Sequence, residues 1–160
     1  MAADSAVMVI DASKGVEAQT IKLFKVCVMR HIPIFTFINK MDRDARDTFE
    51  LLDEIENVLG IRTCPMNWPI GSGKEFKGVY DRETKMVDTF EAISTGGAKK
   101  AAETQYHIED QELKDLIGPY LYDQFKEEIE LVDGATDEVD LEKVQKGELS
   151  PVFFLSLIHI

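Results

Sequence analysis

Apolar runs of strand length alternate with amphipathic segments in the first third of the chain. Residues 6–11 and 34–39 are nearly continuous apolar runs, which are typical of parallel strands buried on both faces. Pro33 suits the first position of the second strand, where its missing N–H does least harm. Between them, helical spacing predicts a helix over residues 16–30 with an inner face of Thr20, Leu23, Phe24, Cys27 and Val28. A strand, a helix and a strand in this order predict a right-handed crossover unit of a parallel sheet.

A second helix is predicted from its two ends. Asp47 followed three residues later by Glu50 forms a capping box, and Gly60 suits the left-handed position just past a helix end. The apolar face between them consists of Phe49, Leu52, Ile55 and Leu59. Residues 61–65 then predict another strand.

The middle of the chain changes character and predicts an insertion at about 66–148. Residues 76–80 and 85–90 predict a β-hairpin around the turn 81–84. The polar segment 95–104 carries Gly, Ala and Lys and predicts a mobile loop.

From Gln111 onward the pattern is helical and acidic. Pro119 suits a helix start, Asp133-Gly134 a helix end, and the inner face consists of Tyr122, Phe125, Ile129 and Val132. A short helix over 138–146 and an apolar strand over 151–154 follow. The elements together predict an α/β fold: a parallel sheet with helices on both faces, plus the inserted hairpin and helical segment.

Acidic side chains on the long helix favour a solvated face over a metal cluster, because surface carboxylates are common and ligand sets are rare. They are Asp123, Glu127, Glu128 and Glu130. No metal site is predicted anywhere in the chain. The segment Gly71–Lys74 resembles the end of a phosphate-binding loop, but Trp68 and Glu75 occupy positions where that loop needs Gly and Ser or Thr. We expect it to form a turn.

Composition describes one soluble domain. The 160 residues carry a net charge of −12, which argues against a nucleic-acid footprint and against attraction to an anionic membrane. Cys27 and Cys64 lie in apolar surroundings without metal-ligand spacing, so reduced buried thiols and a cytoplasmic location are expected. No signal peptide or apolar run of membrane length is present in the sequence.

The candidate site follows the second strand directly, in the segment Asn39-Lys40-Met41-Asp42. Ligands of parallel sheets bind beyond the carboxyl ends of the strands. The Asp42 carboxylate can accept two hydrogen bonds from guanine, from the ring N1–H and the exocyclic amino group, a donor pair that adenine lacks. Asn39 can contact the base edge or stabilise the loop, and the Lys40 stem can cover the base face.

No catalytic group is predicted. His31, His107 and His159 are scattered, without a nucleophile or metal partner at useful spacing. The alternative is therefore a catalytically inert α/β interaction module that binds no nucleotide. In such a module the candidate segment is only a polar loop at the start of a helix. A receiver-like domain phosphorylated at Asp11 ranks lowest, because the acidic pair and trailing lysine of that chemistry are missing.

Several segments together resemble the GTPase domain of the translational GTPases, and in particular its release-factor branch. They are residues 4–12, 15–20, 39–43, 68–71, 76–80 and 149–154, so that the resemblance covers 1–154. It implies a partial P-loop-GTPase-type sheet, GTP or GDP with Mg²⁺ as ligands, and base reading by Asn39, Lys40 and Asp42, with Met41 completing the motif. It also implies GTP-driven removal of class I release factors from the ribosome, with both as partners.

The sequence differs from this family in two places: the segments that bind the phosphates, and the end of the chain. A phosphate-binding loop and two switch segments precede the matching part in the family, and they have no counterpart in 1–160. We therefore expect residues 1–154 to be the C-terminal part of a GTPase domain that is inactive alone, in which residues 6–11 and 34–39 lack neighbouring strands. Where the family has Gly, Ser or Thr, then Ala, this chain has Leu155-Ser156-Leu157. Residues 155–160 resemble a translated sequencing-adaptor end, and we expect a non-native tail without specific partners beyond extending a strand.

Overall fold

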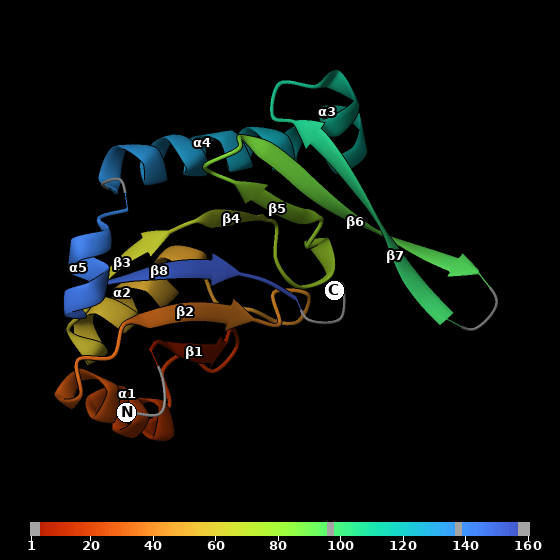
Figure 1. The fold of residues 1–160 in the computed structure, drawn as a ribbon. Coiled ribbons are helices and arrows are strands. Elements are labelled where there is room, and N and C mark those ends of the chain that lie inside the picture. Colours follow the sequence, from red (N-terminus) through yellow and green to blue (C-terminus); the bar gives the residue numbers. More distant parts are fainter. Residues whose placement is uncertain (1–3, 96–97, 137–138, 157–160) are drawn as a thin grey trace.

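The computed structural model describes residues 4–95, 98–136 and 139–156. In these residues a parallel sheet ordered β1-β2-β8-β3 stands beside an antiparallel sheet ordered β4-β5-β6-β7 (Figure 1). The strands are β1 (Ala6–Asp11), β2 (Ile34–Asn39), β3 (Arg62–Pro65), β4 (Asn67–Ile70), β5 (Gly78–Asp81), β6 (Met86–Thr95), β7 (Ala98–His107) and β8 (Leu149–Phe154). The helices are α1 (Ala18–Met29), α2 (Thr48–Leu59), the 3-10 turn η1 (Gly73–Glu75), α3 (Gln111–Ile117), α4 (Pro119–Ala135) and α5 (Leu141–Lys146).

The parallel sheet has its last strand in the middle. β8 pairs with β2 on one side and with β3 on the other, although a long stretch of chain separates it from both. The hydroxyls of Thr36 and Ser150 are 2.7 Å apart and buried, so a polar contact also joins β2 to β8 inside the core. The expectation that residues 34–39 lack neighbours is wrong, because β2 is paired on both edges.

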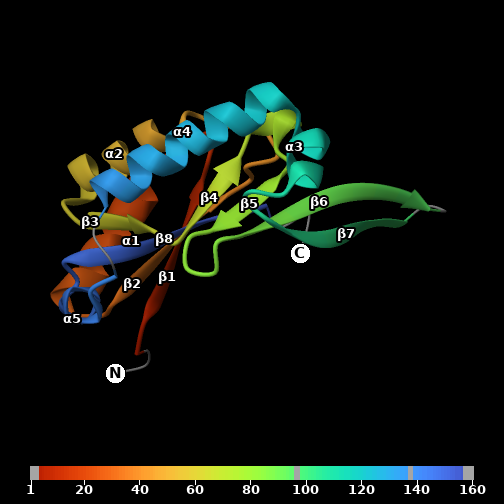
Figure 2. The same cartoon turned by 90° about the horizontal axis from the view of Figure 1, so that it is seen from above.

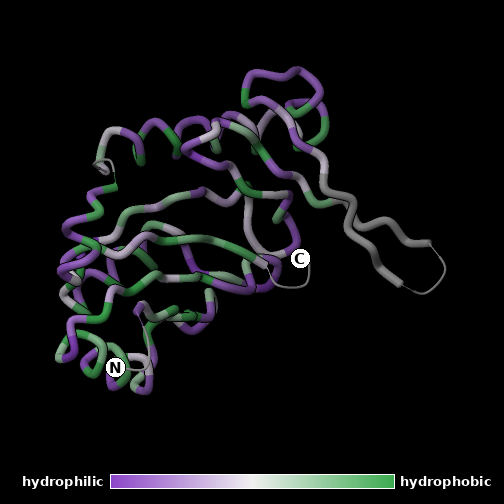
Figure 3. Tube along the Cα trace, in the orientation of Figure 1, coloured by the Kyte–Doolittle hydropathy of each residue, from purple (hydrophilic) through white to green (hydrophobic). Residues whose placement is uncertain are grey.

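Helices lie on both faces of this sheet, which confirms the α/β prediction. On one face Ile38, Val152 and Phe154 belong to the same buried cluster as Phe24 of α1 and Ile55 of α2. On the other face Val144 of α5 forms a smaller cluster with Cys64 and Leu149, against which Phe35 packs. Figure 2 shows α2 and α5 on opposite sides of the strands. In Figure 3 the strands of this sheet are coloured mainly as hydrophobic.

The ends of α2 are set by local sequence, as predicted. Asp47 Oδ1 accepts a hydrogen bond from the backbone N–H of Glu50 at 3.0 Å. Gly60 adopts φ 71° and donates its N–H to the carbonyl of Glu56. A side chain there would need a rarely occupied left-handed conformation, which explains why the helix stops at a glycine.

The prediction that residues 6–11 are buried on both faces is wrong. Val7 and Val9 of β1 are 62% and 57% exposed, and only Ile10 of this strand is fully buried. The inner face predicted for α1 is also too wide, because Leu23 and Val28 are exposed and only Phe24 is buried. β1 is an edge strand, and no element in the described part of the chain covers its side chains Val7 and Val9.

The insertion begins with β4 and contains the predicted hairpin. β5 and β6 pair in antiparallel register from Gly78 opposite Thr89 to Tyr80 opposite Val87. The mobile loop predicted for 95–104 is wrong, because β7 pairs with β6 continuously from Met86 opposite His107 to Thr95 opposite Ala98. Residues 96–97 of that segment lie outside the described residues. The β6–β7 hairpin extends away from the rest of the molecule in both views (Figure 1 and Figure 2).

Helix α4 covers the insertion with the predicted face. Pro119 is its first residue, and its buried side chains are Tyr122, Phe125, Ile129 and Val132. It continues to Ala135, one residue past the predicted end. Asp123, Glu127 and Glu130 are exposed as expected, but Glu128 Oε2 accepts a hydrogen bond from Nε1 of the fully buried Trp68 at 2.8 Å. Glu128 therefore belongs to the packing of the insertion and not to a purely solvated face.

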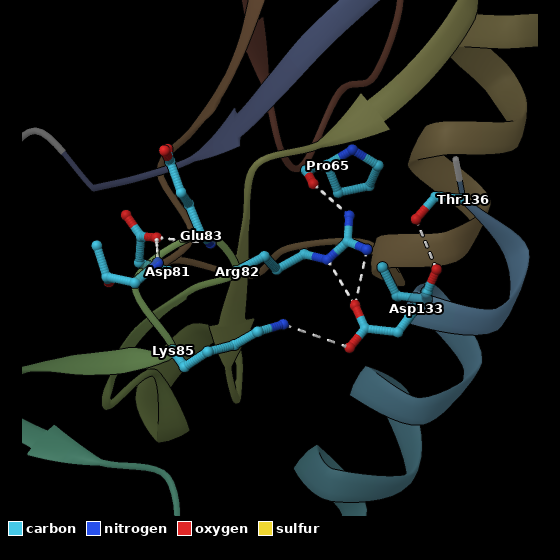
Figure 4. A network of polar contacts seen from close by, with 9 residues as sticks. Pro65, Asp81, Arg82, Glu83, Lys85, Asp133 and Thr136 are labelled. Carbon is cyan, nitrogen blue, oxygen red and sulfur yellow. Dashed lines mark hydrogen bonds and ion pairs between the residues drawn. The ribbon is translucent and has the colours of Figure 1, made fainter. Parts of the chain in front are cut away.

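A polar network fixes the insertion to the parallel sheet (Figure 4). Arg82, in the turn after β5, donates two hydrogen bonds to Asp133 Oδ1 of α4, at 2.9 and 2.7 Å. It donates a third, at 2.6 Å, to the carbonyl of Pro65 at the end of β3. Lys85 Nζ lies 3.9 Å from the second carboxylate oxygen of Asp133. One guanidinium thus connects the hairpin turn, α4 and β3.

Candidate functional site

The predicted site lies at the carboxyl edge of the parallel sheet. Asp11 and Asn39 end β1 and β2 and stand opposite each other in the register. The loop Lys40–Asp42 continues from β2, and the backbone of Leu155 continues from β8 alongside it, donating its N–H to the carbonyl of Ile38 at 2.9 Å. Three strand ends therefore converge on the loop, which is where ligands of parallel sheets bind.

Lys40 is held at both its backbone and its side chain. Its φ of 70° is left-handed, and its N–H donates to Oδ1 of Asn39 at 2.7 Å. Its ammonium Nζ lies 2.5 Å from Asp11 Oδ2. The side chain of Asn39 is buried and stabilises the turn, in agreement with one of the two roles considered for it.

Asp11 is a residue that the sequence analysis did not assign to this site. Its Oδ1 accepts hydrogen bonds from both the N–H and the hydroxyl of Ser13, at 2.9 and 2.7 Å. The hydrogen bond from Lys40 and those from Ser13 hold the pKa of the Asp11 carboxyl well below its ordinary value. The carboxylate is therefore charged throughout the physiological pH range, and it fixes the Lys40 ammonium.

Met41 anchors the loop. Its side chain is fully buried in the core, and its backbone N–H donates to the carbonyl of Leu155 at 3.3 Å. Its own carbonyl accepts a hydrogen bond from the N–H of Gly73 at 2.8 Å. The side chain thus points into the protein, and the main chain carries the contacts of this residue with neighbouring segments.

Asp42 is half-buried and oriented by Ser156. The Ser156 hydroxyl donates to Asp42 Oδ1 at 2.6 Å, and the Ser156 side chain is almost completely buried. The expectation that residues 155–160 have no specific partner beyond extending a strand is therefore wrong for Ser156, whereas Leu155 extends β8 alongside Ile38. Residues 157–160 lie outside the described part of the chain, and the non-native origin of the tail stays a prediction.

This arrangement has the chemistry that guanine recognition requires. A carboxylate has about four acceptor positions, so the hydrogen bond from Ser156 leaves Asp42 able to accept further donors. A carboxylate that accepts two neighbouring N–H groups makes the strong, bidentate kind of contact. The Lys40 ammonium is paired with Asp11, and the methylene groups of its stem can cover an aromatic face.

The phosphate and metal chemistry of a nucleotide is not provided by the same residues. In the described ranges no three His, Cys, Asp or Glu side chains gather into a possible metal site. The segment Gly71–Lys74 forms the predicted turn, and its last two residues already belong to η1. Its Gly73 N–H is directed at the Met41 carbonyl. The residues described do not fit a magnesium–phosphate site.

Sequence reasoning missed Asp11, Ser156 and Gly73 as neighbours of the site. A signal existed for Asp11, because it ends a strand predicted to lie beside β2 and carboxyl ends of parallel strands meet at one edge. The contact of Gly73 with Met41 depends on how the insertion packs, for which the sequence holds no local signal.

Comparisons with known proteins agree on one family. The family model described as the elongation factor Tu GTP binding domain matches residues 1–159. Proteins named peptide chain release factor 3 are similar along nearly the whole chain. That of Symbiobacterium thermophilum is 54% identical over 157 residues, covering 98% of this chain and 30% of the relative. That of Gloeobacter violaceus is 56% identical over 153 residues, covering 96% and 29%.

The fold has a counterpart among solved structures. A crystal structure of a Thermus thermophilus protein matches with a TM-score of 0.59 at 21% identity, covering 97% of this chain and 24% of that one. The chain spans less than a third of the release factors that it matches. None of the described helices is long and apolar enough to cross a membrane. The chain belongs to the translational GTPase family, and nearly all of it matches the elongation factor Tu GTP binding domain.

Proposed function

We propose that this chain supplies the guanine-reading part of the GTP-binding domain of a release-factor-type translational GTPase. By resemblance, such a protein uses GTP to release class I release factors from the ribosome. Within it, Asn39, Lys40, Met41 and Asp42 form the base-binding segment. GTP and GDP, with Mg²⁺ on the phosphates, are the ligands of the longer protein.

The observation that carries this proposal is the orientation of Asp42. Its carboxylate lies at the carboxyl edge of the sheet and is half-buried, with one oxygen held by Ser156 at 2.6 Å. A preoriented carboxylate loses little conformational freedom when it accepts the two N–H groups of guanine.

The proposal assigns no hydrolytic step to these residues. Binding of the phosphates needs backbone N–H groups, a lysine and a Mg²⁺-binding hydroxyl, and hydrolysis needs a positioned water. The described residues do not fit that role, so the chain's own contribution is to bind and orient the base.

A segment exchange tests the proposal. In the release factor 3 of Symbiobacterium thermophilum, the 157 residues that match are replaced by those of this chain. The purified hybrid is titrated with a fluorescent GDP derivative, and GDP or ADP is added as competitor. We expect saturable binding that GDP displaces and ADP does not.

The controls separate base reading from folding. Circular dichroism establishes that the hybrid is folded, and the unmodified relative gives the reference affinity. A folded hybrid that binds no GDP, or that ADP displaces equally well, contradicts the proposal and favours the inert interaction module. Release of a class I factor from termination complexes by the hybrid then tests the function of the whole protein.

A further inference from the structure

Met66 and Asn67, which connect the parallel sheet to the insertion, lie beside the end of β8. Met66 donates its N–H to the carbonyl of Val152 at 2.8 Å. Asn67, the first residue of β4, then contacts both main-chain groups of Phe154. Its Nδ2 donates to the Phe154 carbonyl at 3.0 Å, and its Oδ1 accepts from the Phe154 N–H at 2.7 Å. One side-chain amide thus fixes the last residue of β8.

The residues immediately after Phe154 support the candidate site. The carbonyl of Leu155 accepts the N–H of Met41, and the hydroxyl of Ser156 donates to Asp42. The position of the Phe154 main chain therefore determines where both contacts are made. Asn67 holds Phe154, the residue directly before Leu155 and Ser156.

The insertion contacts the site a second time and is closely packed there. Gly73 donates its N–H to the Met41 carbonyl at 2.8 Å, and a Cβ on Gly73 would lie 3.2 Å from the Arg43 carbonyl oxygen. Trp68, next to Asn67, is fully buried, and its ring meets that of Phe154 edge-on at 5.4 Å. The insertion thus touches both segments that form the site.

We propose that Asn67 is a positioning residue of the guanine site. From the insertion it holds the Phe154 main chain, and through Leu155 and Ser156 it fixes the Met41 amide and the Asp42 carboxylate. This inference rests on the proposed function of the loop. It makes the insertion a structural support of base binding, so that displacing β4 from β8 loosens the hold on guanine.

Amide hydrogen exchange in the ¹⁵N-labelled chain tests the positioning without any nucleotide. Asn67→Ala is expected to accelerate exchange of the Met41 and Leu155 amides by about tenfold, the loss of one good hydrogen bond. Amides of the β1–β2 ladder, such as that of Phe37, keep their rates. Asn57→Ala, on the exposed side of α2, is the matched control. Acceleration confined to β4 and β5, or none at all, overturns the proposal.

A second variant keeps the test decisive if Asn67→Ala does not fold. Asn67→Asp retains an acceptor for the Phe154 N–H but loses the donor to its carbonyl. Exchange at Met41 and Leu155 should then lie between the wild-type and alanine rates. Wild-type rates in a folded Asn67→Asp chain contradict the proposal.

The hybrid protein supplies the functional measurement. There Asn67→Ala should weaken GDP binding by about tenfold, while Asn57→Ala leaves it unchanged. Equal affinities of the two variants overturn the assigned role in base binding. If the unsubstituted hybrid binds no GDP, the proposed function fails, and the exchange rates still decide whether Asn67 positions Met41 and Leu155.

Discussion

The ammonium of Lys40 lies 2.5 Å from the carboxylate of Asp11, so an ion pair joins the carboxyl ends of β1 and β2. The Asp11 side chain is 14% exposed and the Lys40 side chain 42%. Because Asp11 also accepts two hydrogen bonds from Ser13, its charge is fixed in place, and Lys40 is held without any ligand. The proposed base-reading loop is therefore preorganised from the neighbouring strand.

Asp11→Asn should lower the free energy of unfolding at pH 7 by about 1 kcal/mol, since half-exposed charged hydrogen bonds are screened by water. The folded-state pKa of Asp11 lies below its ordinary value of 3.8, so this stabilisation is present above that pH. It is lost as the pH falls through the folded-state pKa. Urea unfolding at several pH values measures the difference between wild type and variant.

The difference in the free energy of unfolding between wild type and Asp11→Asn is expected to be constant from pH 7 to about pH 5 and to shrink below about pH 4. Asp53→Asn, on the exposed side of α2, serves as the control and should change stability little at any pH. A difference that grows on acidification is incompatible with a carboxylate stabilised by Lys40.

Asp42→Asn in the hybrid protein should change which base is preferred. An amide offers one donor and one acceptor, so it no longer matches the two donors of guanine but suits xanthine, which has a carbonyl in place of the amino group. Losing the charged partner costs about 1.5–3 kcal/mol, roughly tenfold to over a hundredfold in GDP affinity. Competition with GDP and xanthosine diphosphate measures the affinity for each base. An unaltered GDP affinity would show that Asp42 does not contact guanine.

The chain alone should bind neither GTP nor GDP at micromolar concentration. The base site offers a few hydrogen bonds of about 1.5–3 kcal/mol each, while association costs on the order of 4–15 kcal/mol in lost freedom. Calorimetric titration of the 160-residue chain with GDP and Mg²⁺ makes the measurement. Saturable micromolar binding would reveal a phosphate site within this chain.

The outer face of β1 should cause self-association. Val7 and Val9 are exposed on an edge strand, and the half-buried rings of Phe37 and Phe153 stack at 5.0 Å on the same face of the sheet. Exposed apolar edges favour pairing with another chain. Val9→Glu should shift the chain toward monomer in sedimentation velocity.

Leu131→Glu is the matched control for this prediction, because Leu131 is 63% exposed on α4, away from the parallel sheet. It should leave the distribution of species as in the wild type. Equal sedimentation of Val9→Glu and wild type at all concentrations would show that the β1 face is not the contact.

Sequence reasoning succeeded where structure is decided locally. Asp47 and Gly60 set the ends of α2 through contacts within one turn, and the β5–β6 hairpin follows from its own alternation. It failed at β7, where ladder hydrogen bonds to β6 override the weak strand preference of the segment. It also failed for the exposure of Val7 and Val9, because burial depends on which elements surround a strand.

The site shows the same division. The loop Asn39–Asp42 could be predicted as a candidate because it directly follows an apolar run. The partner of Asp42 was not, since Ser156 lies 114 residues away and arrives only through the pairing of β8 with β2. Likewise the sequence places Glu128 on a uniform acidic face, because its contact with Trp68 depends on how α4 packs on the insertion.

The central position of β8 has a consequence for the order of events during synthesis. β1 and β2 can pair once residue 39 has left the ribosome, but β3 has no strand beside it until Leu149–Phe154 is available. The contact between Thr36 and Ser150 spans 114 residues. Such non-local pairing is slow because a long loop must close before any contact forms. The nascent chain therefore passes through a stage in which β2 and β3 expose open edges, and protection by a chaperone matters most between translation of residues 65 and 154.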